Sequence, residues 1–446
     1  MEMKITKNPV FFGGLIIVWF LICSTGLASM AEGELVEVGL AFNIEEIRLD
    51  GAGDTILLDL GNPNQEVLSW VGDQALVTTG GEKIYINDLP VSSGPLLVLS
   101  ANYSLTWEER AYRGALLIFS RNGKLNLINR LPLEDYLRGV VPKEVPAGWP
   151  MAALKAQAIA ARTYTLANLG RHRVEGFQLC ATTHCQVYQG LSGEHPNTDR
   201  AISETQGMVV THENKLIAAV YHDSSGGYTK DASEIWSQPV PYLIPAPGWD
   251  SDSPYNQWTQ SFSWEELGGY INKAYPEIGE LRQLLPADFG GDGRIIKLTL
   301  KGSNGERVVT GEQFRHAIGI PSSNMKIGIV YGPEPLVTLW WRRGQDQIEG
   351  ALFEPEVFAE NFEIIEPGRE APDPWPQLRE KAPIRLDIRG AGRGHGVGLS
   401  QWGAKGMAEA GYNEKQILEH FYPGAAVTKM AVSREIVGET VPNVSQ

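Results

Sequence analysis

The segment LEDYLRGVVPKEVPAGWPMAALKAQAIAARTYTLANLG, residues 133–170, contains the strongest structural signals in the chain. Pro132, just before it, suits the first turn of a helix. Glu134 and Asp135 follow where the positive end of the helix dipole favours acidic side chains. We therefore predict a helix that begins at Pro132.

A second helix is predicted from Met151 to Leu169. Pro150 comes directly before it, no glycine or proline interrupts it, and Gly170 ends it. Helical spacing brings a set of small and apolar side chains onto one face, namely Leu154, Ala158, Ala161 and Thr165. Because alanines allow close approach of another backbone, this helix is expected in the middle of a domain.

Short apolar runs alternate with turn residues ahead of this segment, from Val36 to about Leu105. That pattern predicts a small β-rich domain, to which we assign residues 32–109. Two further apolar runs, 115–119 and 125–129, flank Asn122-Gly123, a strong hairpin signal. Since these strands precede the two predicted helices, we expect an α+β fold.

The composition narrows the class of protein. The 446 residues carry a formal net charge of −15, and 43% are hydrophobic. These values are those of a globular chain, and exclude a disordered chain, a collagen-like repeat and a polytopic membrane protein. The acidic balance also argues against general nucleic-acid binding, which needs a basic surface.

Residues 1–31 are predicted to be a signal peptide or membrane anchor. Lys4 and Lys7 precede a largely apolar stretch, and Ser29 and Ala31 suit cleavage after Ala31. The apolar stretch is also about as long as a bilayer span requires, so retention as an anchor is the alternative. In either case the rest of the chain is expected outside the cytoplasm, secreted or anchored to the cell membrane.

Four segments together resemble one family. They are LEDYLRGVVPKEVP at 133–146, which continues into 149–164, CATTHCQVY at 180–188, SSGGYT at 224–229, and GRGHGVGLSQWGA at 392–404. In this order they are similar to the stage II sporulation protein D (SpoIID/LytB) family of bacterial cell-wall proteins. The resemblance covers about residues 110–430, with 245–383 as a β-rich and Pro-rich insertion and 431–446 as a tail.

The resemblance implies a mixed α/β domain with a substrate cleft. It also implies a lytic transglycosylase that cleaves the MurNAc-GlcNAc β-1,4 bond of peptidoglycan, giving 1,6-anhydroMurNAc ends, in sporulation (engulfment). Cleavage needs an acid to protonate the leaving oxygen. Glu144 matches the family's catalytic glutamate, and its apolar neighbours Val141 and Val145 would favour the protonated carboxyl group. A solvated glutamate beside Lys143 is the alternative.

Other residues of these segments are candidates for binding substrate. Lys155, Arg162 and Tyr164 lie on the second predicted helix, where the resemblance implies groove-lining side chains. The candidates for the cleft wall are Ser224, Gly226, His395, Ser400 and Gln401. Ordinary helix-surface polarity and a tight structural turn are the alternative interpretations, and the glycines around His395 would permit a positive φ.

Cys180, His184 and Cys185 lie within six residues, with His172 eight positions before the first of them. Thiolate and imidazole are the ligands that zinc prefers. Some family members bind zinc with this cluster, which implies a zinc site here, structural rather than catalytic. A disulfide between Cys180 and Cys185 is the alternative, since an exported chain meets oxidising conditions.

A non-catalytic alternative for the function also remains open. The chain would then be a wall-binding protein that stimulates a partner amidase or glucosaminidase. Its expected partners are peptidoglycan glycan strands, and also a wall amidase or endopeptidase and a membrane scaffold of the engulfment machinery, with no nucleic acid.

Overall fold

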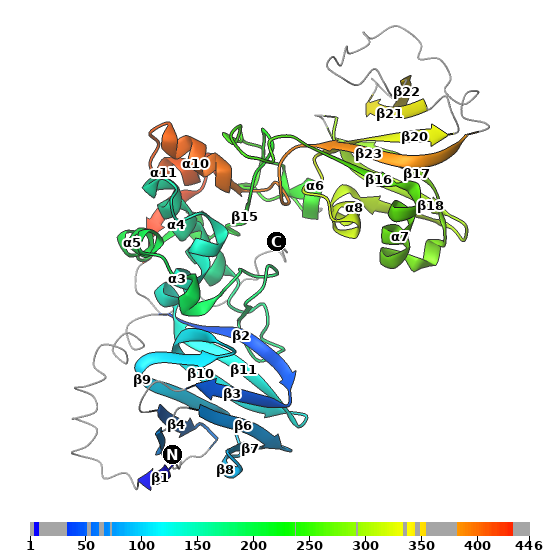
Figure 1. Ribbon diagram of the computed structural model, residues 1–446. Coiled ribbons are helices and arrows are strands. Elements are labelled where there is room, and N and C mark those ends of the chain that lie inside the picture. Colours follow the sequence, from blue (N-terminus) through cyan, green and yellow to red (C-terminus); the bar gives the residue numbers. More distant parts are fainter. Residues whose placement is uncertain are drawn as a thin grey trace. The chain divides into compact units, whose positions relative to one another are not determined.

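The computed structural model describes residues 4–8, 34–50, 55–61, 67–71, 74–236, 238–290, 293–332, 337–343, 348–353 and 381–430. The chain divides into two units (Figure 1). Unit 1 comprises residues 1–220, 412–419 and 425–446, and unit 2 comprises residues 221–411 and 420–424. Strands and helices occur in both units, so the predicted α+β class is confirmed.

A large sheet forms the N-terminal part of unit 1. Its main path runs β12-β2-β11-β10-β9-β3-β6-β7-β8, with β1, β4 and β5 paired beside it. The strands are β1 (Lys4–Asn8), β2 (Leu35–Ile44), β3 (Glu46–Asp50), β4 (Thr55–Asp59), β5 (Val67–Val71), β6 (Gln74–Gly80), β7 (Lys83–Ile86), β8 (Leu89–Ser92), β9 (Leu96–Trp107), β10 (Arg110–Arg121), β11 (Lys124–Pro132) and β12 (Leu179–Cys180).

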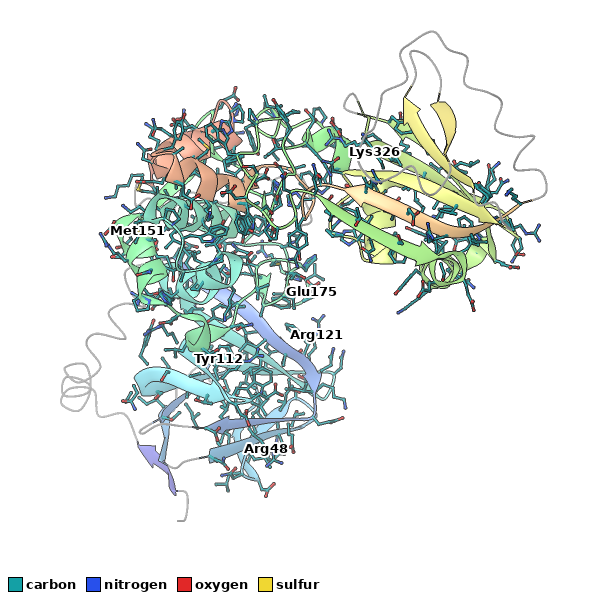
Figure 2. All side chains as sticks on the ribbon, turned by 45° about the horizontal axis from the view of Figure 1, so that its top comes forward. Arg48, Tyr112, Arg121, Met151, Glu175 and Lys326 are labelled. Atoms are coloured by element: carbon teal, nitrogen blue, oxygen red, sulfur yellow. The ribbon has the colours of Figure 1, made fainter. Side chains whose placement is uncertain are left out.

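The predicted hairpin lies in the middle of this sheet. Asn122 and Gly123 adopt φ values of 55° and 73°, as a two-residue turn of this kind requires, and Arg121 pairs with Lys124. Arg121 is labelled in Figure 2. Strand β10 also pairs with β9, and β11 also pairs with β2, so the sheet continues to Pro132. The predicted domain boundary between residues 109 and 110 therefore falls inside one sheet.

Two helices follow, as predicted. Helix α3 (Leu133–Glu144) begins after Pro132, with Glu134 and Asp135 in its first turn. Helix α4 (Met151–Ala167) begins after Pro150, and twelve of its 17 residues are buried. A helix that is buried on most of its faces belongs inside a domain, which confirms the expectation from its alanines. Met151 is labelled in Figure 2.

Smaller elements complete unit 1. They are the 3₁₀ turn η1 (Gly190–Gly193), helix α5 (Pro196–Glu204), and a three-stranded sheet of β14 (Lys215–Leu216), β13 (Met208–His212) and β25 (Ala426–Lys429). Strand β25 lies over 200 residues after β13 in the sequence and pairs with it antiparallel. Helix α11 (Glu414–Phe421) precedes β25.

Unit 2 contains a short parallel pair, β15 (Tyr221–His222) with β24 (Leu399–Ser400), and helices α6 (Ala232–Trp236) and α10 (Gln401–Glu409). Between them lies an insertion with its own hydrophobic core. The insertion comprises β16 (Trp258–Ser263), α7 (Trp264–Ala274), η2 (Pro276–Ile278), β17 (Leu281–Phe289), β18 (Ile295–Gly302), β19 (Glu306–Thr310), α8 (Gly311–Ile318), β20 (Met325–Gly332), β21 (Val337–Arg343), β22 (Ile348–Phe353) and β23 (Ala382–Gly390).

Local sequence explains both helices of the insertion. Ser263 and Glu266 form a capping box at the start of α7, and Thr310 and Gln313 form one at the start of α8. Gly319 ends α8 in the left-handed conformation.

Three predicted segments, namely the leader, the Pro-rich segment and the C-terminal tail, lie largely outside the described residues. Residues 9–33, 354–380 and 431–446 belong to this undescribed part. The leader therefore stays a prediction, and so does the tail. No helix among the described residues is long and apolar enough to cross a membrane.

Candidate functional site

Glu144 is the last residue of α3 and is half-buried. Its Oε1 accepts a hydrogen bond from the backbone N–H of Val187, at 3.3 Å. Two apolar residues beside it in the sequence, Val141 and Val145, are buried. The carboxyl group is thus held at the end of a helix, with one oxygen oriented by the backbone of a separate loop.

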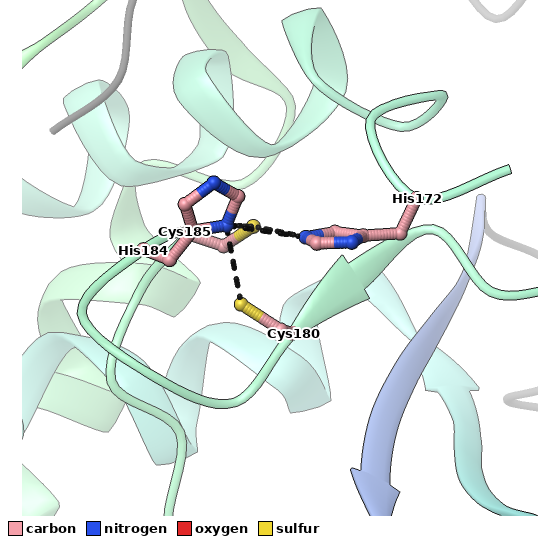
Figure 3. A group of neighbouring side chains, drawn as sticks. All are labelled: His172, Cys180, His184 and Cys185. Carbon is pink, nitrogen blue, oxygen red and sulfur yellow. Dashed lines mark hydrogen bonds between the residues drawn. The ribbon is translucent and has the colours of Figure 1, made fainter. Parts of the chain in front are cut away.

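That loop also carries the candidate metal ligands (Figure 3). His172 follows α4, Cys180 ends β12, and His184 and Cys185 lie in the turn after it. Their ligand atoms all lie within 4.8 Å of one another, so the four predicted ligands are brought together. The cluster can bind a metal ion.

The distances between these atoms test which metal geometry fits. His172 Nε2 lies 3.2 Å from His184 Nδ1, and Cys185 Sγ lies 3.4 Å from His172 Nε2. His184 Nδ1 lies 3.6 Å from Cys180 Sγ and 3.7 Å from Cys185 Sγ. Tetrahedral zinc with ordinary bond lengths would separate two nitrogens by ~3.4 Å and a nitrogen from a sulfur by ~3.6 Å. The donor set and the spacing therefore fit a four-ligand zinc site.

Cys180 and Cys185 are free thiols that interact with each other. A hydrogen bond from Cys185 is the main reason why the pKa of Cys180 is lowered to about 3, with Thr182 and His184 also contributing. The same interaction raises the pKa of Cys185, which burial raises further. One thiolate is thus already favoured in this cluster, and a thiolate is the form that binds metal.

An aromatic stack supports His172. Its ring stacks on Phe177 with centroids 4.6 Å apart, and Phe177 stacks on Phe42 of β2 at the same separation. His172 Nδ1 also lies 3.5 Å from an oxygen of Glu175, a residue labelled in Figure 2. Since the other ring nitrogen faces the cluster, these contacts orient the imidazole, as outer partners of metal ligands commonly do.

Three consecutive residues, Cys185 to Val187, link the metal-ligand cluster to the hydrogen bond that Glu144 accepts. Cys185 is followed by Gln186, which is fully buried and accepts hydrogen bonds from Tyr136 of α3 at 3.3 Å and from Thr165 of α4 at 2.8 Å. Val187, the donor to Glu144, comes next. Neither Gln186 nor Val187 is among the residues predicted from the sequence, because no local pattern distinguishes a buried glutamine or a backbone N–H.

The three predicted groove residues of α4 differ in their environment. Lys155 is half-buried and pairs with Glu204 at 2.7 Å. Arg162 is fully buried, and its guanidinium makes two hydrogen bonds to Glu134, at 2.8 and 2.7 Å. Tyr164 is also buried, and its hydroxyl accepts a hydrogen bond from Arg171. Arg162 and Tyr164 therefore have little surface to offer a sugar, and only Lys155 is partly accessible.

In unit 2, three of the predicted residues meet around Asp250. The buried Asp250 carboxylate accepts hydrogen bonds from the hydroxyls of Ser224 and Ser400 and from the backbone N–H of Gly226. Ser225 donates to it as well. Burial alone would raise the pKa of Asp250, but hydrogen bonds from these serines outweigh it and lower that pKa. Nothing in the sequence pairs Asp250 with these motifs.

Gly226 shows why these motifs are rich in glycine. Its φ is 71°, and a Cβ there would lie 2.5 Å from the backbone of Ala391. Ser224 and Arg393 exchange backbone hydrogen bonds of 3.1 and 2.7 Å. The predicted positive φ around His395 is confirmed, with values of 97° at Gly394 and 82° at Gly396.

His395 and Gln401 are buried. His395 Nε2 lies 3.1 Å from the carbonyl of Tyr221, and its Nδ1 accepts from the N–H of Val397. Burial, with His222 nearby, lowers the pKa of His395 to about 3, and burial lowers that of His222 to about 4. Both imidazoles are therefore neutral at pH 7.

The predicted residues thus form two groups. Glu144, Lys155, Arg162, Tyr164 and the metal cluster belong to unit 1, whereas Ser224, Gly226, His395, Ser400 and Gln401 belong to unit 2.

The family model for SpoIID, Stage II sporulation protein, matches residues 121–212. This range contains Glu144 and all four candidate metal ligands.

Similar proteins come from several bacteria. The chain is 26% identical over 320 residues to an uncharacterized protein of Brachyspira hyodysenteriae (strain ATCC 49526 / WA1), covering 71% of this chain and 72% of the relative. It is 27% identical over 328 residues to Stage II sporulation protein D of Bacillus amyloliquefaciens, covering 68% and 76%. It is 30% identical over 313 residues to Amidase enhancer of Bacillus subtilis (strain 168), covering 66% of this chain and only 40% of that relative.

Proposed function

Because the chain belongs to the stage II sporulation protein D family, we propose that it is a lytic transglycosylase. It cleaves the MurNAc-GlcNAc β-1,4 bond of peptidoglycan glycan strands. The observation that carries this proposal is the placement of Glu144 at the end of α3, where its carboxyl group accepts a hydrogen bond from the N–H of Val187; the sequence resemblance matches this residue to the family's catalytic glutamate.

A single carboxyl group is enough for this reaction. Glu144 donates its proton to the glycosidic oxygen as the bond from that oxygen to C1 of MurNAc breaks. The resulting carboxylate then accepts the proton of the MurNAc 6-hydroxyl, and O6 forms the new bond to C1. The products are a GlcNAc 4-hydroxyl and a 1,6-anhydroMurNAc end, Glu144 is protonated again, and no water is consumed.

The metal site has a structural role in this proposal. His172, Cys180, His184 and Cys185 would hold zinc with four protein ligands, which leaves no open position for a catalytic water. When bound, zinc would tie the loop that presents Val187 to the end of α4. The residue that transfers protons is Glu144.

The biological setting follows from the relatives' names. Stage II sporulation protein D in two Bacillus species supports a role in sporulation, and we propose that the chain acts during engulfment. The predicted leader, residues 1–31, would place the chain outside the cytoplasm, where peptidoglycan lies. Partners in the engulfment machinery, such as a wall amidase or endopeptidase, fit this setting.

One observation favours a second function. The relative named Amidase enhancer supports a non-catalytic protein that binds the wall and stimulates an amidase. In that case the carboxyl group of Glu144 would be dispensable.

Substitution of Glu144 separates the two functions. Glu144→Gln keeps the size and the hydrogen bond from Val187 but cannot transfer a proton. We expect it to abolish cleavage of purified glycan strands while the melting temperature stays near that of the wild type. Glu409→Gln, which changes a more exposed carboxylate on α10, should leave both cleavage and melting temperature unchanged. If Glu144→Gln turned over strands at the wild-type rate, the proposed function would be wrong.

A further inference from the structure

A narrow apolar surface follows the SSGG motif in unit 2. The segments 227–229 and 244–249 run side by side, with Thr229 N donating to Ala246 O at 2.9 Å and Gly248 N donating to Gly227 O at 2.7 Å. Tyr228 and Pro247 form an antiparallel bridge between them. The two segments therefore act as a short two-stranded ladder.

Side chains alternate across this ladder. Ala246, Gly248 and Asp250 are buried, whereas Pro247 and Trp249 between them are exposed. Tyr228 is 64% exposed, and Trp249 is 44% exposed. Because diagonal neighbours on one face of a ladder lie within reach of aromatic side chains, the rings of Tyr228 and Trp249 share the outward side.

The backbone holds Trp249 in an unusual conformation. Its φ is 54°, which is rare for a bulky side chain and costs free energy. The residue is fixed by its neighbours: the next residue is the buried Asp250, and Gly406 packs so closely that a Cβ there would lie 2.1 Å from the carbonyl oxygen of Trp249. This fixed backbone thus presents a tryptophan that is 44% exposed.

We propose that Tyr228 and Trp249 form a carbohydrate-binding platform on which sugar rings of the glycan strand stack. The proposal rests on the proposed function and names a second region of this chain that binds the same substrate. Tyr and Trp provide large, rigid contact surfaces that combine an apolar face with a polar edge, which suits the mixed faces of a pyranose ring.

A cation lies on the adjoining loop. Arg393 is exposed, and its backbone pairs with Ser224, four residues before Tyr228. Its guanidinium lies over the ring of Tyr255 at 4.7 Å and donates to that hydroxyl at 2.9 Å. A guanidinium held in this way matches the lactyl carboxylate of MurNAc.

The size of the surface favours a sugar chain over a protein. Pro247, Trp249 and Tyr228 make up the strip, whereas a stable protein interface takes about 20–30 residues from each partner. Three side chains suffice for one or two sugar rings.

Binding of purified, peptide-free glycan strands to the full-length protein tests the platform. It is measured in the Glu144→Gln background so that strands are not consumed. Trp249→Ala and Tyr228→Ala should each raise the Kd about tenfold. Trp249→Phe should restore most of the affinity, and Tyr270→Ala, which removes a tyrosine of 46% exposure from α7, should leave it unchanged.

With Glu144 intact, Trp249→Ala should raise KM and leave kcat near the wild-type value. Unchanged Kd in a Trp249→Ala protein with a wild-type melting temperature would overturn the platform, as would loss of amidase stimulation without loss of glycan binding. Failure of the proposed function shows differently: either the wild-type protein would leave strands intact, or cleavage would persist in Glu144→Gln, whatever the strand affinity.

Discussion

The N–H of Val187 lies 3.3 Å from Glu144 Oε1, and Val187 follows the candidate metal ligand Cys185 by two residues. The loop that carries the candidate metal ligands therefore also orients the proposed catalytic acid. We propose that a bound metal supports catalysis only by fixing this loop, and that no metal-bound water takes part in the reaction.

Removal of a thiolate ligand tests this coupling. We expect the purified protein to contain about one equivalent of zinc. Cys180→Ser should release the metal and lower the melting temperature, because the unfolded loop cannot assemble the site. Strong chelation should do the same, and activity should fall only as structure is lost. Elemental analysis and thermal unfolding provide the measurements. A metal-free chain two hydrogens lighter than the reduced form would establish the disulfide instead.

The buried ion pair of Arg162 predicts a large effect on stability. Arg162→Ala leaves Glu134 without its partner and also frees the carbonyls of Met208 and Ile202. We expect a loss of about 3 kcal/mol in the free energy of unfolding. Lys155→Ala removes a more exposed pair on the same helix and should cost less than about 1 kcal/mol. Denaturant titration compares the two, and equal losses would contradict the structural assignment of Arg162.

The two buried histidines of unit 2 predict acid sensitivity. Their pKa values in the folded chain, about 4 for His222 and about 3 for His395, lie below the ordinary value of 6.5. The unfolded chain therefore binds more protons between about pH 6.5 and 4, and stability falls as the pH falls through this window. The slope should approach about 1.4 kcal/mol per pH unit for each histidine.

Urea unfolding at a series of pH values measures this slope. His222→Gln should make it shallower. A stability that does not change between pH 6.5 and 4 would count against buried neutral histidines.

Deletion of residues 1–31 tests the predicted leader. The full-length chain should appear in membrane or exported fractions, and the deleted chain should remain in the cytoplasm. Cell fractionation with an antibody against the chain decides this. Export of the deleted chain to the same extent would show that the segment is not the signal.

Local sequence was sufficient where local interactions decide the structure. The turn at Asn122-Gly123 and the start of α4 after Pro150 were both predicted from neighbouring residues. The spacing of Cys180, His184 and Cys185 likewise indicated a cluster that the fold does assemble.

Contacts between distant residues were not predictable in this way. Asp250 lies 150 residues before Ser400, yet its carboxylate accepts a hydrogen bond of 3.0 Å from the Ser400 hydroxyl. Arg162 looked like a polar residue on a helix face, and only the fold shows that Glu134 and two carbonyls enclose it. Burial of this kind depends on which elements pack together, which no short pattern encodes.

The mass of the products formed in ¹⁸O-labelled water tests the central claim most directly. Purified glycan strands are digested with the wild-type protein, and the new ends are analysed by mass spectrometry. The account predicts 1,6-anhydroMurNAc ends that contain no ¹⁸O, because the 6-hydroxyl attacks C1 in place of water. Reducing ends that carry ¹⁸O would show hydrolysis and contradict it, and intact strands would leave the amidase-stimulating function as the better account.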